Sequence, residues 1–260
     1  MDPPGSRYGS SELRMKRAIL AVLAAIAIVT PPVHAQSLDI DAPAWGPRLK
    51  VTPFLGYAPI VSRTEHWLFV DNGASARDIY HVTLGAGLAA GGSVEMQVLE
   101  RFAVAGSATW ISRGDTEERS EATDARFRHQ GSNFLMAKVG IAVRLREQVS
   151  DLQVHSMTGT VFFGPAYVRE MPKPDPNVPS PVFLDPFSYT GLNFGLDIVL
   201  PVVRDRITFT AGIEDYYFHW DDAEFSRRND IAAGGTARST VESSASHNVL
   251  ARAGFSFRIR

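Results

Sequence analysis

Seven charged residues recur where the surrounding sequence alternates between apolar side chains and small or polar ones. They are Glu95, Lys138, Arg144, Asp197, Glu214, Arg252 and Arg258, all on the polar parity of their segments. Residues of one parity share a face of a strand, so these side chains would face a common interior. Charges in a narrow interior must pair or be hydrated. The pattern predicts a structural salt-bridge network, with Glu214 near Arg252 and Glu95 within reach of Lys138; an ion path is the alternative.

Residues that could form a catalytic or metal site have unsuitable spacing. The candidates are the pairs His155-Ser156 and Ser246-His247 and the cluster of His219, Asp221 and Ser226. A nucleophile and its base must share a face and have an acid nearby, whereas neighbours on a strand point to opposite faces. No His, Asp or Glu spacing argues for a metal. We therefore expect no enzyme, no catalytic residues and no metal ligands.

Composition excludes several further classes. The chain has no cysteine, which removes disulfides, thiolate metal sites and lipid-anchored lipoproteins. The formal net charge of −2 argues against a nucleic-acid partner. Gly85–Gly91 is rich in glycine, but alternation continues through it, so it is not a dinucleotide-binding loop. No cofactor is expected.

The segments that must position the seven charges alternate with period two, which is the strand signature. Alternation is clear in Val82–Val98, Leu135–Leu145, Leu192–Leu200 and Val249–Ile259, and weaker in Arg48–Ile60, Phe102–Ile111, Met157–Val168 and Ile207–His219. Many of these segments match the ~9–11 residues that a tilted strand needs to cross a bilayer. The sequence predicts eight strands, with a β-bulge at Pro53, which cannot donate a ladder hydrogen bond.

The connections between these segments alternate in length. Leu99–Arg101, Glu147–His155 and Val203–Arg206 are short or middling, whereas Val61–Arg77, Ser112–Gly131, Glu170–Phe187 and Asp221–Ser246 are long and polar. Short turns at one end and long loops at the other are typical of an up-and-down transmembrane barrel. Such an eight-stranded interior is only just wide enough for side chains to fill it, which favours the salt-bridge network over the ion path.

Alternation alone leaves open which face is outside. A soluble barrel that binds a small apolar ligand would place the apolar face inside, whereas a transmembrane barrel places it in lipid. Strand length favours the transmembrane arrangement, as does the abundance of glycine and small residues on the polar face, which suits a narrow interior.

The N-terminal segment has the features of a secretory signal peptide. A positive stub that ends at Arg17 precedes the apolar run Ala18–Val29, and Ala35 is the small residue before a cleavage site. The run is too short to span a bilayer; a short buried helix is the alternative. We predict a signal peptide over residues 1–35, with the true start at Met15, and an outer-membrane barrel over residues 36–260.

The mature chain resembles the small eight-stranded outer-membrane β-barrel family, which includes the barrel of outer membrane protein A, the X-type outer membrane proteins and the opacity proteins. The resemblance rests on the segment Thr52–Tyr57, the glycine-punctuated second strand and a last strand that runs to the chain end. One departure is the final residue, because family members end on an aromatic residue, whereas Phe257 lies inward of Arg260.

The resemblance implies a protein of the outer membrane, and the lack of a suitable catalytic cluster favours a non-enzymatic one. Its expected role is structural, or surface binding through the long extracellular loops, with the interior closed by charged side chains. Its partners would be outer-membrane lipid and lipopolysaccharide, the outer-membrane assembly machinery and a surface ligand. The alternatives are the soluble periplasmic or secreted barrel and a small porin-like channel.

Overall fold

The computed structural model describes residues 48–71, 74–99, 101–145, 158–174, 185–203, 206–232, 234–235 and 237–259. The predicted signal peptide and the predicted start of the mature chain therefore lie outside the described residues, as do His155, Ser156 and most of the proline-rich connection before Phe187. Among the described residues, no helix is both long and apolar enough to cross a membrane.

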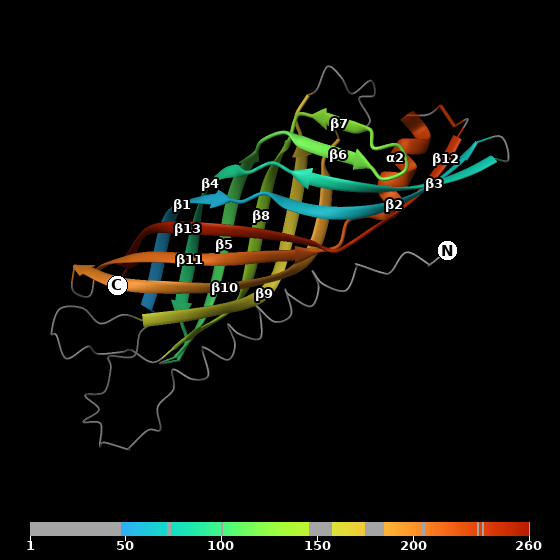
Figure 1. Ribbon diagram of the computed structural model, residues 1–260. Coiled ribbons are helices and arrows are strands. Elements are labelled where there is room, and N and C mark those ends of the chain that lie inside the picture. Colours follow the sequence, from blue (N-terminus) through green and yellow to red (C-terminus); the bar gives the residue numbers. More distant parts are fainter. Residues whose placement is uncertain are drawn as a thin grey trace, which may run out of the picture. The chain divides into compact units, whose positions relative to one another are not determined.

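Eight strands close into an antiparallel barrel (Figure 1). They are β1 (Arg48–Ala58), β4 (Gly87–Gln97), β5 (Phe102–Arg113), β8 (Ser132–Arg144), β9 (Thr158–Pro172), β10 (Phe187–Val203), β11 (Ile207–Phe218) and β13 (Ser246–Ile259). Strand β1 pairs with both β4 and β13, which closes the ring. Closure leaves no strand edge unpaired within the barrel. The predicted eight-stranded antiparallel barrel is confirmed.

Three of the four long connections, Val61–Arg77, Ser112–Gly131 and Asp221–Ser246, contain strands or a helix that were not predicted from the sequence. They form a five-stranded sheet in the order β12 (Ala237–Ser243), β2 (Val61–Asp71), β3 (Ala74–Leu84), β6 (Thr116–Ser120) and β7 (Arg126–His129). This order repeats that of the barrel strands β13, β1, β4, β5 and β8. The second sheet therefore continues five adjacent barrel strands beyond the end of the barrel opposite the short turns, which we call the mouth (Figure 1). Helix α2 (Asp222–Ala232) packs against β12. One face of an antiparallel sheet can be exposed to water and carry polar residues. The polar composition of these segments therefore does not distinguish such strands from loops.

The predicted strand Val82–Val98 is two strands, which separate at Gly85 and Ala86. A side chain at Gly85 would meet the carbonyl oxygen of Asp115 at 2.6 Å, so glycine permits the barrel wall to bend here against the neighbouring strand. The bend also shifts the parity by one residue. Val82 and Leu84, which the alternation places on the lipid face, are therefore buried.

The β-bulge predicted at Pro53 is also absent. Val51 pairs with Phe257 and Phe54 with Gly254, so the register with β13 passes Pro53 unchanged. On the paired strand, the carbonyl of Pro53 lies so close to Gly254 that a side chain there would collide with it.

The apolar face of the barrel points outward. Leu88 is 74% exposed, Val139 55% and Phe255 50%, whereas the inward Met136 and Asn193 are fully buried. A soluble barrel would instead present mainly polar side chains at these outer positions.

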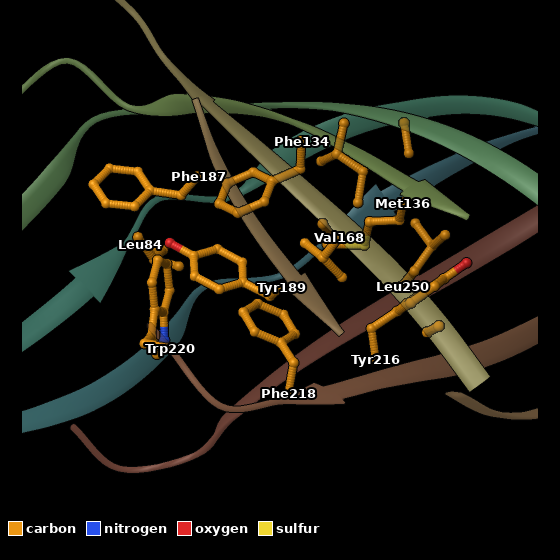
Figure 2. Close-up of a cluster of buried hydrophobic side chains, with 14 of the residues drawn as sticks. Leu84, Phe134, Met136, Val168, Phe187, Tyr189, Tyr216, Phe218, Trp220 and Leu250 are labelled. Carbon is orange, nitrogen blue, oxygen red and sulfur yellow. The ribbon is translucent and has the colours of Figure 1, made fainter. Parts of the chain in front are cut away.

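The interior near the mouth is an apolar core (Figure 2). Its side chains come from barrel strands and the chain just beyond them, and include Phe134, Met136, Val168, Phe187, Tyr189, Tyr216, Phe218, Trp220 and Leu250. Tyr189 and Phe218 stack with ring centroids 5.2 Å apart, and Trp220 packs edge-on against Tyr189 at 4.8 Å. The mouth half of the barrel is thus filled by large side chains.

Candidate functional site: the charged interior and the mouth pocket

Four charged side chains from four different strands meet in the middle of the barrel. The Glu214 carboxylate, fully buried, lies 2.7 Å from Nζ of Lys138 and 2.5 Å from Nε of Arg252. Arg252 also pairs with Asp197 at 2.7 Å. Two cations and two anions therefore neutralise one another in a confined space.

Neutral groups complete this middle cluster. Nζ of Lys138 donates a hydrogen bond to the side-chain oxygen of Asn193 at 3.0 Å and lies 4.0 Å from the centre of the Phe162 ring. Gly212 faces the Asp197 carboxylate so closely that a side chain there would collide with it.

A second cluster lies toward the short turns. Glu95 pairs with Lys50 at 2.5 Å and with Arg144 at 2.9 Å. The expected approach of Glu95 to Lys138 is wrong, because each belongs to a different cluster. Lys50 was not among the predicted residues, although it lies on the inward parity of β1 between Arg48 and Thr52. Arg258 pairs across the ladder with Lys50, which places its backbone beside this cluster.

Arg113 is a further buried cation that the sequence pattern missed. Only 1% of it is exposed, and its guanidinium donates to the carbonyls of Pro59 and Gly85 and to the side-chain oxygen of Asn248. The pattern placed it in a loop. Its inward parity with Ile111 was the available signal, because β5 continues to Arg113.

The predicted His and Ser clusters form no catalytic arrangement among the described residues. Ser246 is buried, while His247 faces outward and pairs with Asp215 at 2.6 Å, so the two lie on opposite faces as predicted. Asp221 accepts the backbone N–H of Glu224 at 3.0 Å and so caps α2. The hydroxyl of Ser226 donates to the Asp222 carbonyl. In the described part of the chain, no group of three or more acidic or histidine side chains could hold a metal ion.

A pocket of about 270 Å³ lies where the second sheet leaves the barrel, and we call it the mouth pocket. Its wall includes Arg63 and Trp67 of β2, Glu118 of β6, His129 of β7, Glu170 of β9, Phe187 of β10, and Lys173, Trp220, Phe225 and Asn229. Residues from the barrel, the second sheet and α2 therefore meet in one cavity.

Arg63 is the centre of the pocket's polar wall. Its guanidinium carbon lies 3.5 Å from the centre of the Trp220 ring, which is a cation–π contact. It also pairs with Glu65 at 2.6 Å, and the other oxygen of Glu65 accepts the indole N–H of Trp67 at 3.0 Å. Arg63 and both tryptophans are thus held in fixed orientations.

Two carboxyl groups lie on the remaining wall. Glu170 accepts the hydroxyl of Ser132 at 2.6 Å. Burial, and to a smaller extent the charge of Glu65, raise the pKa of Glu118 to about 7 against the opposing effect of Arg63. Glu118 also lies 3.7 Å from the imidazole of His129. The protonation of the pocket wall therefore changes near neutral pH.

No protein-family model and no curated protein matches the sequence. Among solved structures, the chain is similar to the outer membrane protein OprG from Pseudomonas aeruginosa, with 9% identity, a TM-score of 0.50 and coverage of 82% of this chain and 96% of OprG. It also matches Neisserial surface protein A (10% identity, TM-score 0.35, coverage 79% and 97%) and Ail of Yersinia pestis (15%, 0.30, 80% and 98%). The chain has the fold of the small eight-stranded outer-membrane β-barrels.

Proposed function

We propose that the chain is a non-enzymatic outer-membrane protein. Its barrel, with a closed interior, would anchor a binding surface outside the cell. The observation that carries the proposal is the distribution of side chains, because large apolar groups face outward around the barrel while charged groups pair inside it. A hydrocarbon environment makes such an exterior favourable, and a closed barrel satisfies its backbone hydrogen bonds there. Outer-membrane lipid, lipopolysaccharide and the assembly machinery are the partners that this placement requires.

The second sheet and α2 supply the surface that would act outside the cell. They stand at the end of the barrel opposite the short turns, which is the extracellular end in barrels of this type. We infer that residues 1–35 direct export and are then removed, so the mature N-terminus would be Gln36.

A small channel is the second candidate, since charges line part of the interior. The paired middle cluster and the apolar core above it favour a closed interior over a conducting one.

Fractionation and conductance test the proposal together. The protein should remain with outer membranes after a salt wash and require detergent for release. Purified barrel in planar bilayers should conduct far less than a general porin measured in parallel. Release without detergent would overturn the membrane placement, and large stable conductance would promote the channel.

A further inference from the structure

Two residues of the mouth pocket's wall each carry a buried hydrogen-bond donor that has no acceptor among the described residues. The donors are Nη1 of Arg63 and Nε1 of Trp220. Their groups are adjacent, because the Arg63 guanidinium stacks on the Trp220 ring. A buried donor without an acceptor is costly, so a molecule in the pocket that offers oxygen acceptors would be stabilised here.

The charges of the pocket wall cancel. Arg63 and Lys173 carry two positive charges, and Glu118 and Glu170 two negative ones at full ionisation. A ligand with a net charge would therefore meet groups of its own sign as well as the opposite sign. The wall suits a neutral ligand that both donates and accepts hydrogen bonds.

Aromatic rings provide the apolar part of the wall. Trp67 and Phe225 meet edge to face at 5.6 Å, and Phe187 lies 5.9 Å from Phe225. The cavity of about 270 Å³ falls just below the ~300–1,000 Å³ of pockets for drug-sized ligands. The space therefore suits a single ring with apolar faces and a polar edge.

We propose that the mouth pocket binds one neutral sugar ring, whose hydroxyl oxygens accept from Arg63 and Trp220 and whose hydroxyl groups donate to Glu118. The C–H faces of the ring would pack against Trp67 and Phe225. This inference deepens the surface-binding role proposed above and rests on it for the exposure of the pocket outside the cell.

Tryptophan fluorescence of the full chain folded in detergent micelles tests the proposal, because Trp67 and Trp220 line the pocket. The probes are glucose, galactose and N-acetylglucosamine, with benzoate and choline as charged controls, all at pH 8, where Glu118 is ionised. At least one neutral sugar should give a saturable change, and neither charged probe should. Saturation by benzoate or choline alone, or no saturation by any sugar, would overturn the proposal.

Two matched variants locate the binding. Glu118→Gln should weaken sugar binding about tenfold, because the sugar hydroxyl would donate to a neutral amide oxygen in place of a carboxylate. Glu117→Gln is the control, because Glu117 is the exposed neighbour on the other face of β6. Equal affinities of the two variants would place binding elsewhere and contradict the proposal. Micelle titration does not depend on membrane placement, so its failure is distinct from failure of the fractionation test.

Discussion

The half of the barrel interior near the short turns contains the two clusters of ion pairs, whereas the half near the mouth is filled mainly by aromatic and aliphatic side chains, with the buried Arg113 among them. The change occurs at the same level on three strands. Along β11 toward the mouth, the next inward-facing residues after Glu214 are Tyr216 and Phe218. Along β8 in the same direction, those after Lys138 are Met136 and Phe134. On β13, the buried Leu250 follows Arg252. One continuous barrel wall therefore encloses two interiors of different chemistry.

The two halves constrain the fold in different ways. An ion pair in a dry interior is tolerated only with its partner in place, because each isolated charge keeps a desolvation cost of several kcal/mol. Apolar packing has no such pairing requirement and depends on filled volume. In the charged half, the loss of unfolding free energy on mutation should therefore depend strongly on whether the ionic partner is present. In the mouth half, it should depend mainly on the volume of the side chain that is removed.

The largest effect is expected for Glu214→Gln. The change preserves shape but leaves Lys138 and Arg252 with Asp197 as their only nearby anion in the middle cluster. Breaking a buried ion pair in this way costs about 3–5 kcal/mol. Urea unfolding of the detergent-folded protein would measure the loss.

The double variant Lys138→Met with Glu214→Gln gives this prediction its control. It leaves Arg252 and Asp197 as a pair with equal and opposite charges, so part of the lost stability should return. Double and single variants of equal stability would mean that the middle cluster is not held by charge pairing.

Met136→Ala should give the next largest effect, in the mouth half. Met136 is fully buried in the apolar core, and truncation of a buried methionine costs about 2–5 kcal/mol. Met96→Ala is the matched control, because Met96 is 42% exposed on the outer face. Equal losses of unfolding free energy at the two sites would show that the mouth half is not packed as described.

The strands of the barrel could be predicted from the sequence because a strand with two different environments alternates visibly. Leu192 to Leu200 shows this, with apolar residues outward and Asn193 and Asp197 inward. The second sheet could not be predicted in the same way. Its strands are short or polar, and the bend at Gly85 shifts the parity where the sequence shows only continued alternation.

The inward parity of the charged residues was predictable, but most of their partners were not. Glu214 and Arg252 lie on strands that pair directly, so their contact followed from topology. Lys138 reaches Glu214 across the interior, which depends on how the strands are staggered around the ring. The mouth pocket could not be predicted, because its wall residues are far apart in the sequence and no sequence pattern indicates that they meet.

The smallest expected effect is a pH dependence of stability at the mouth pocket. The groups that face Glu118 are Arg63 and Glu65 of β2, Tyr80 of β3 and His129 of β7, with Glu170 and Lys173 on the same cavity wall. The pKa of Glu118 is about 7 in the folded chain, against 4.5 ordinarily. Between these values the unfolded chain has lost the proton that the folded chain keeps, so stability should fall as pH rises through this window. The unfolding temperature would be measured in detergent between pH 5 and 7, in a His129→Asn background that removes the nearby imidazole. In this background, Glu118→Gln should reduce the decrease of the unfolding temperature with rising pH. Glu117→Gln should retain the slope of that background, and an unchanged slope in Glu118→Gln would show that another group titrates.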